Sequence, residues 1–321
     1  MILSLQGCMA VGKTTAVRFL QANAPYINIS YEINTDIVDE VKRRNLDKNV
    51  YEDYLEIQKL WLRKEVIRYE KAKKHLCSVM DFGAEEIEFY TLNYPKSIGA
   101  DWEVENALKK ELDEVRGCMP DRILFLDASD EVLRSHKQND STRSRNFFEH
   151  HLTHMMPLKR KWFVGRDNVD LLRVDELQAA EVGVKVREWC DRQILTVKLK
   201  ELKIQPVGNG FIDMICPPES INAFIDLCNL MGLRIAGFTW WCHVTGGHEP
   251  CGMGGPRSEY DDGWFSEIPM DKIIELKDNE AYKTYFSMEW PEAPEYRECY
   301  RPGFWIQTNQ VCREDVTAGI D

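Results

Sequence analysis

Residues 7 to 15 of the chain read Gly7-Cys8-Met9-Ala10-Val11-Gly12-Lys13-Thr14-Thr15. They fit the pattern G-x-x-x-x-G-K-[ST], in which glycines let successive backbone N–H groups turn toward phosphate oxygens without a Cβ in the way. The motif is specific when a strand precedes it and a helix follows it. Here the apolar residues 2 to 5 precede it, and a helical pattern over residues 14 to 23 follows it. The sequence therefore predicts a phosphate-binding loop (P-loop) that holds a nucleoside triphosphate.

The residue types within the P-loop indicate the chemistry of the ligand. Lys13 would reach the β- and γ-phosphates, and the hydroxyl of Thr14 would ligate Mg²⁺. The N-terminus of the helix adds its partial positive charge. The other residues predicted to bind the nucleotide are Gly7, Ala10, Val11, Gly12 and Thr15. We therefore predict ATP and Mg²⁺ as cofactors, with GTP left open as an alternative to ATP.

Residues 1 to 195 alternate strand-like runs with helical patterns, which is typical of a parallel sheet covered by helices. The predicted strands are residues 2 to 5, 27 to 31, 76 to 80, 123 to 126 and 169 to 174. The predicted helices are residues 14 to 23, 54 to 74, 104 to 116 and 177 to 192. Near residue 195 this pattern stops, and Pro206 with the glycines after it breaks any continuing helix. We expect an α/β P-loop NTPase domain with a five-stranded parallel sheet at 1 to 195, and a smaller α+β domain of unknown role at 196 to 321.

A P-loop enzyme also needs a carboxylate near the magnesium, and two apolar runs end in aspartate, at Asp81 and at Asp127. In the short P-loop kinase topology, the strand after a long helical crossover lies beside the first strand, and this favours Asp81. Asp127 precedes a helical stretch and is better explained as a turn and helix cap. A turn or capping aspartate is also the alternative for Asp81.

The order of these features resembles the deoxynucleoside kinase and thymidylate kinase branch of the P-loop nucleoside and nucleotide kinases. The resemblance covers residues 1 to 195 and rests on the P-loop, on Glu32 after the second strand, on Asp81-Phe82-Gly83, on residues 126 to 134 and on an arginine-rich stretch after them. It implies phosphoryl transfer from ATP to a small acceptor, first of all a nucleoside or a nucleotide. Phe82 departs from the family, in which an arginine follows this acid and helps to hold substrate or phosphate. An acceptor such as an antibiotic or a sugar derivative is therefore the alternative.

The resemblance also implies roles for single residues. Glu32 matches the base that accepts the proton of the acceptor hydroxyl, with Asp36 as a competing candidate and a solvated strand-end residue as the alternative. Residues 134 to 145 resemble the lid of the family, in which Arg143 and Arg145 would close over the transferring phosphoryl group. A plain basic surface loop is the alternative. The predicted catalytic residues are Lys13, Glu32, Asp81, Arg143 and Arg145, and the predicted Mg²⁺ ligands are Thr14 and Asp81.

Three further groups of residues could form metal or acceptor sites, but each also has a structural explanation. His150 and His154, one helical turn apart, are better explained as ordinary polar positions than as metal ligands. A glycine-rich loop packed on tryptophans explains the C-terminal cluster better than zinc does; that cluster contains Cys242, His243, His248 and Cys251. Acids and aromatic rings follow Asp81 where an acceptor could bind, and core packing explains them equally well: Glu85, Glu86, Glu88, Phe89, Tyr90 and Tyr94.

Composition limits the partners. The net charge is -12, and residues 196 to 321 hold 20 acidic against 11 basic side chains. Such a segment repels phosphate backbones, so we expect neither nucleic acid nor an anionic membrane surface as a partner. No stretch approaches the roughly 18 uncharged apolar residues of a membrane span, and we expect neither signal peptide nor anchor. Ten scattered cysteines favour a reducing compartment, the cytoplasm.

Two alternatives stay open at the level of the whole chain. The oligomeric state is not fixed by the sequence, and a homodimer is one arrangement. Outside the enzyme class, the alternative is a nucleotide-dependent switch whose acidic C-terminal domain binds a protein partner.

Overall fold

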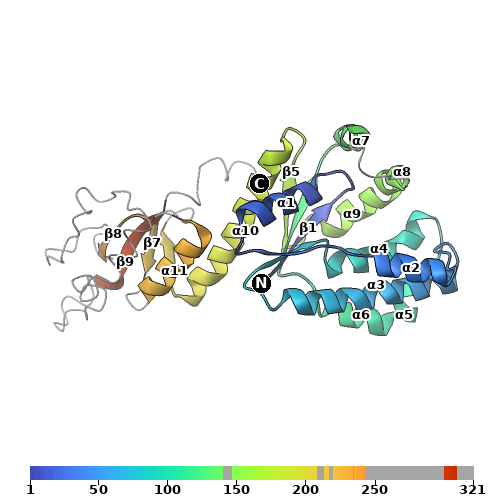
Figure 1. Ribbon diagram of the computed structural model, residues 1–321, viewed down its shortest axis with the longest axis horizontal. Coiled ribbons are helices and arrows are strands. Elements are labelled where there is room, and N and C mark those ends of the chain that lie inside the picture. The colour runs from blue at the N-terminus through green and yellow to red at the C-terminus, as the bar shows by residue number, and fades with distance from the viewer. Residues whose placement is uncertain (140–146, 208–212, 217–219, 234, 243–299, 309–321) are drawn as a thin grey trace. The chain divides into compact units, whose positions relative to one another are not determined.

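The computed structural model describes residues 1–139, 147–207, 213–216, 220–233, 235–242 and 300–308 (Figure 1). The chain divides into two compact units, the first of which takes in Met1–Arg187, while the second begins at Glu188. The expected boundary at residue 195 stays a prediction. No helix within the described ranges is long and apolar enough to cross a membrane.

The first unit is built on a five-stranded parallel sheet in the order β2-β3-β1-β4-β5. The strands are β1 (Ile2–Gly7), β2 (Asn28–Ser30), β3 (Ser78–Asp81), β4 (Arg122–Asp127) and β5 (Val169–Arg173). All six residues of the central strand β1 are buried, as strands covered on both faces must be. The predicted sheet is confirmed, and β3 lies beside β1, with Leu5 paired to Asp81.

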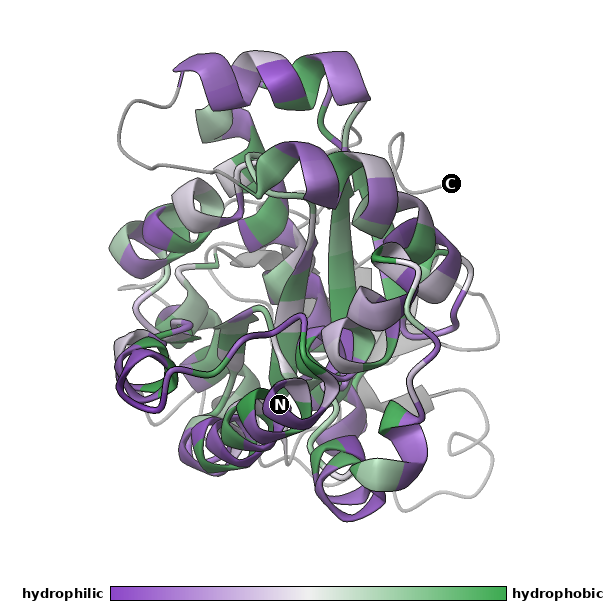
Figure 2. Cartoon of the chain, turned by 90° about the vertical axis from the view of Figure 1, so that its right-hand side faces the viewer, coloured by the Kyte–Doolittle hydropathy of each residue, from purple (hydrophilic) through white to green (hydrophobic). Residues whose placement is uncertain are grey.

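Helices flank this sheet on both sides, and their hydrophobic residues face the strands (Figure 2). The helices before β4 are α1 (Lys13–Asn23), α2 (Thr35–Arg43), α3 (Tyr51–Ala72), α4 (Ala84–Ser97), α5 (Val104–Ala107) and α6 (Lys109–Arg116). Those after β4 are α7 (Asp130–Asn139), α8 (Phe148–His150), η1 (His151–Met155), α9 (Met156–Phe163) and α10 (Ala179–Glu201). The helix expected over residues 104 to 116 is interrupted at Leu108, whose side chain is fully buried.

One hydrophobic cluster joins α3, α4, α5 and α6. Its aromatic rings stack, with the centroids of Tyr54 and Tyr94 5.6 Å apart and those of Tyr90 and Tyr94 5.2 Å apart. Core packing therefore accounts for the rings that follow Asp81 in the sequence. The turn η1 is π-helical and lies between α8 and α9.

In the second unit, the described strands form an antiparallel sheet in the order β6-β7-β9-β8. These strands are β6 (Gln205–Val207), β7 (Asp213–Cys216), β8 (Ile235–Cys242) and β9 (Tyr300–Thr308), with helix α11 (Ile221–Met231) between β7 and β8. The described residues of this unit contain a helix and antiparallel strands, and the expected α+β domain stays a prediction.

Candidate active site

The P-loop runs from the end of β1 to the start of α1, and two glycines shape it. Gly7 has φ +131° and Gly12 has φ +101°, a region that L side chains rarely adopt. A Cβ on Gly7 would lie 2.2 Å from the carbonyl oxygen of Leu126, so β4 leaves no room for one. A Cβ on Gly12 would meet nothing within 4 Å, so the open side of the loop lies there. The loop thus has the shape that phosphate binding needs, with the unpaired N–H groups of the first helical turn behind it.

Lys13 is nearly buried and its ammonium closes the loop. Its Nζ donates hydrogen bonds to the carbonyl oxygens of Gly7, at 2.9 Å, and Cys8, at 2.7 Å. Burial, and then the positive charge of Lys159, lowers the pKa of Lys13 to about 8, while Asp81 opposes the shift. Lys13 therefore stays largely cationic at neutral pH.

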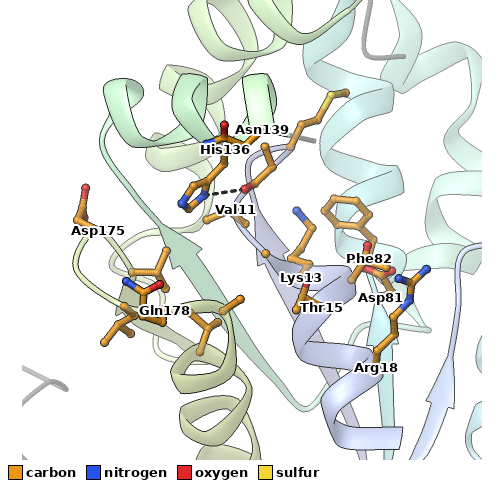
Figure 3. A pocket seen from close by; sticks show the side chains of 18 of the residues that line it. Val11, Lys13, Thr15, Arg18, Asp81, Phe82, His136, Asn139, Asp175 and Gln178 are labelled. Atoms are coloured by element: carbon orange, nitrogen blue, oxygen red, sulfur yellow. Dashed lines mark hydrogen bonds between the residues drawn. The ribbon is translucent and has the colours of Figure 1, made fainter. Parts of the chain in front are cut away.

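A cavity of ≈ 1120 Å³ opens in front of the P-loop, and every described residue that lines it belongs to the first unit. The P-loop divides this cavity into two parts, which we call the Asp81 half and the Asp175 half (Figure 3). The Asp81 half contains Arg18, Asp81 and Phe82. The Asp175 half contains His136, Asn139, Asp175 and Gln178. His136 donates from Nδ1 to the carbonyl oxygen of Ala10 at 3.1 Å, which joins α7 to the loop.

The structure brings most of the predicted site residues to this cavity. Its lining includes Ala10, Val11, Gly12, Lys13, Thr14, Thr15, Glu32 and Asp81, while Gly7 forms the base of the loop. Glu32 follows β2, and Asp81 ends β3. Because β2 and β3 are parallel neighbours, their carboxyl ends lie at the same edge of the sheet, and both acids are therefore placed at that edge. Arg143 and Arg145 lie outside the described residues.

Glu32 has the most perturbed carboxyl on the wall of the cavity. Burial raises its pKa to about 7, Glu86 and Asp81 add to the rise, and Arg68 opposes it. Glu32 is nevertheless exposed to solvent, because it lines the open cavity. The protein atoms that surround its other side account for the effect of burial on its pKa. A carboxylate with a pKa near 7 is suited to accept a proton at neutral pH.

Arg68 of α3 is a residue that the sequence analysis missed. Its Nε and Nη2 bond both carboxylate oxygens of Glu65, at 2.9 and 3.0 Å, and its Nη1 reaches the carbonyl oxygens of Ser30 and Asp81 at 3.3 and 3.4 Å. Its Nη2 also donates to the carbonyl oxygen of Phe82. This guanidinium is thus occupied in holding the ends of β2 and β3, and only the Glu65-Arg68 spacing marked it in the sequence.

Arg18 is the exposed cation of the Asp81 half. It lies one helical turn after Thr14 on α1, and its side chain is on the same side of the P-loop as Asp81 and Phe82 (Figure 3). Within the described part of the chain it has no hydrogen bond or ion pair. An arginine with a free guanidinium is suited to a phosphate or another anionic group.

The acids after Asp81 are structural and do not line the cavity. Glu85 accepts hydrogen bonds from Ser4 and from Gln6, the latter at 2.6 Å. Glu86 pairs with Lys159 at 2.7 Å, and Glu88 pairs with Arg116 at 2.6 Å. Each carboxylate therefore holds α4 to another part of the unit.

Two other candidates also have structural partners. Asp127 is 2% exposed and accepts hydrogen bonds from Arg160, and Arg173 forms an ion pair with it at 2.8 Å. Asp127 also accepts the N–H of Ala128 at 3.1 Å, so it stabilises the turn before α7 as expected. At the start of the helix itself, the hydroxyl of Ser129 accepts the N–H of Val132 at 3.4 Å. Asp36 is exposed, pairs with Lys64 and does not line the cavity.

The candidate metal clusters gain no support. The rings of His150 and His154 lie 4.9 Å apart, but among the described residues no group of three potential ligand side chains comes together. Cys242 ends β8, and His243, His248 and Cys251 lie outside the described residues.

No protein-family model matches the sequence, and no curated protein matches it. Among solved structures, a thymidylate kinase from Candida albicans is 14% identical, with a TM-score of 0.42, over 61% of this chain and 91% of that one. A deoxyadenosine kinase from M. mycoides, with the products dCMP and dCDP bound, is 16% identical, with a TM-score of 0.44, over 63% of this chain and 100% of that one. Both names belong to the kinase branch that residues 1 to 195 resemble. TM-scores this low carry no argument about what this chain binds.

Proposed function

We propose that this protein is a phosphotransferase that moves the γ-phosphoryl group of ATP to a hydroxyl of a small acceptor. One observation carries the proposal: the P-loop shares one cavity with Glu32 and Asp81. Its ≈ 1120 Å³ is slightly above the roughly 300–1,000 Å³ of an ordinary small-molecule site. A nucleotide bound with Mg²⁺ requires one of these carboxylates, Asp81, and leaves Glu32 available to the acceptor.

The triphosphate would bind at the N-terminus of α1. The backbone N–H groups around Gly12 would contact its phosphates, and the ammonium of Lys13 would neutralise them. Thr14 and Asp81 line the same cavity and offer the oxygen ligands that Mg²⁺ prefers. When bound, the ion would neutralise charge that develops on the phosphate oxygens.

The acceptor would bind in the Asp81 half. Its hydroxyl would attack the phosphorus atom as the bond from the γ-phosphorus to the β,γ-bridging oxygen breaks, with ADP as the leaving group. Glu32 would take the proton of that hydroxyl, which its pKa of about 7 allows near neutrality. Arg18 would meet charge on the transferring group or on the acceptor, and Arg143 and Arg145 stay proposed for the closing lid.

A nucleoside or a nucleotide is the acceptor we propose first. It rests on the resemblance of residues 1 to 195 to kinases for these compounds. The aromatic rings after Asp81 supply no additional argument, since most of them are packed in the core. Phe82, which stands in place of an arginine, keeps an antibiotic or a sugar derivative as the alternative acceptor.

The test is ATP consumption by the full chain in the presence of nucleosides, nucleoside monophosphates and other small alcohols, each added alone. We expect one class of compound to raise turnover steeply and to appear as its phosphate ester. Lys13→Ala should abolish this turnover, while Lys71→Ala, an exposed lysine of α3, should leave it unchanged. Stimulation by a bound protein and by none of the compounds would replace this proposal with the nucleotide switch.

A further inference from the structure

Lys159 of α9 is a fully buried lysine, with an exposed fraction of 0%. Its Nζ lies 2.7 Å from Oε2 of Glu86 on α4. Burying two charges is costly, and apolar residues of similar volume often stabilise a core as well or better. The need for a stable fold alone is therefore a weak explanation for a lysine and a glutamate buried together at this place.

The ring of Phe82 lies close both to this pair and to the lysine of the P-loop. The Nζ of Lys159 is 4.9 Å from the centroid of the ring, and the Nζ of Lys13 is 4.3 Å from the same centroid. Both distances are within the range of a cation–π interaction. Phe82 also has φ +58°, which is unusual for a bulky residue, and Arg68 holds its carbonyl oxygen. Phe82, whose ring contacts the ammonium of Lys13, is thus held in a strained backbone conformation.

The helical segment that carries Lys159 also touches the P-loop directly. His151 of η1 places its Nδ1 3.5 Å from the sulfur of Cys8. The same segment thus contacts the loop at Cys8 and the ring at Phe82. It follows residues 140–146 in the chain, which contain Arg143 and Arg145.

We propose that Lys159, held by Glu86, is a positioning residue that fixes the ring of Phe82 under Lys13 and thereby sets the place of the Lys13 ammonium for the triphosphate. The inference rests on the proposed function in one respect, that Lys13 binds phosphate. It gives a reason for an aromatic residue at position 82, because an arginine there would bring a third cation between two lysines.

The electrostatics around Lys13 agree with this arrangement. The charged and titratable groups that act on it are Lys159 from α9, Asp81 from β3, Cys8 from the loop and Glu86 from α4. After burial, Lys159 does most to lower the pKa of Lys13 to about 8, and the other three oppose it.

The first test compares Lys159→Met with Lys161→Met, an exposed lysine on the same helix. ATP binding is measured by calorimetry with Mg²⁺ and without any acceptor. Lys159→Met should weaken binding about ten- to hundred-fold, because a misplaced ammonium loses its phosphate contacts. Lys161→Met should leave the affinity unchanged, and equal effects of the two variants would overturn the proposal.

A second pair of variants separates positioning from stability. Lys159→Met leaves Glu86 buried without its partner and should destabilise the fold, whereas Lys159→Met combined with Glu86→Met removes both charges and should restore resistance to urea. If affinity for ATP stays low in this double variant, the ammonium positions Phe82. If affinity returns together with stability, the pair is only structural and the proposal fails.

Phe82→Leu tests the route through the ring. In that background, Lys159→Met should weaken ATP binding no further, and fully additive losses would overturn the proposal. If the wild-type chain fails to bind ATP, the proposed function fails by itself. The place of the Lys13 ammonium against the ring can then be followed without ATP by NMR of labelled lysine side chains, assigned with Lys13→Arg. An unchanged Lys13 signal in Lys159→Met would overturn the inference, and a displaced one would support it.

Discussion

Glu32 shows how the position of one residue in the fold can change its acid–base chemistry. The end of β2 brings its carboxyl beside Asp81 and near Glu86, while the cavity keeps one side of it open. Crowding by protein and by like charge disfavours the ionised form, so the pKa rises from 4.5 to about 7. The sequence placed an acid here, but it could not show the shift, which depends on residues from three separate elements.

Activity should therefore depend on pH with a defined sign. Below pH 7 the Glu32 carboxyl is mostly protonated and cannot accept a proton, so kcat/KM should rise with pH through about 7. It should fall again as Lys13 loses its proton above about 8. Glu32→Gln should lower kcat about 10²- to 10⁴-fold and remove the rising limb. The measurement is the pH profile of kcat/KM with the acceptor that the panel of compounds identifies.

Asp36→Asn is the matched control, because Asp36 is exposed and lies outside the lining of the cavity. It should leave both limbs of the profile unchanged. A rising limb that persists in Glu32→Gln would assign that limb to another group and contradict the role of Glu32 as the base.

At the scale of elements, the sequence predicted what local pattern determines. The five strands are short apolar runs and the P-loop is marked by its glycines, so each can be recognised from neighbouring residues alone. The structure has all of them in the expected places. Helix α4 was missed because its acids suggest a surface, whereas Glu85, Glu86 and Glu88 are buried by partners distant in the sequence. Lys159 was missed for the same reason, because the sequence of α9 does not show which of its lysines is buried against a distant partner.

The packing of α10 on α1 can be tested at Gly183. A Cβ there would lie 2.5 Å from Cγ and 2.8 Å from Cβ of Phe19, so the two helices would have to move apart. Alanine is the better helix former by about 1 kcal/mol. We nevertheless expect Gly183→Ala to lower the free energy of unfolding by about 1–3 kcal/mol, because overpacking outweighs propensity. Urea denaturation measures this change.

Val184→Ala is the control for that substitution, since Val184 is the next residue on the same helix and is 43% exposed. It should change the free energy of unfolding by less than about 0.5 kcal/mol. A stabilised Gly183→Ala variant would mean that α1 and α10 are not in such close contact.

At the scale of the whole molecule, the cavity and the acidic part of the chain belong to different units. Every lining residue lies between Met9 and Val182, within the first unit, and the negative charge is concentrated after residue 195. Helix α10 is shared, because the boundary between Arg187 and Glu188 falls inside it. The described residues that line the cavity therefore come from the first unit, and no residue pattern in the sequence indicates the role of the second.

Hydrogen exchange with and without MgATP tests this division on the full chain. A ligand that binds the folded state at a concentration 100 times its Kd stabilises that state by about 2.7 kcal/mol. Because the cavity is lined by the first unit alone, slower exchange should appear in peptides from the P-loop, residues 78 to 82 and residues 174 to 182. Peptides covering 213–216 and 221–231 should exchange as before, and Lys13→Ala should lose the protection everywhere. Equal protection of both units would contradict the assignment of the nucleotide to the first unit alone and would place the second in the binding reaction.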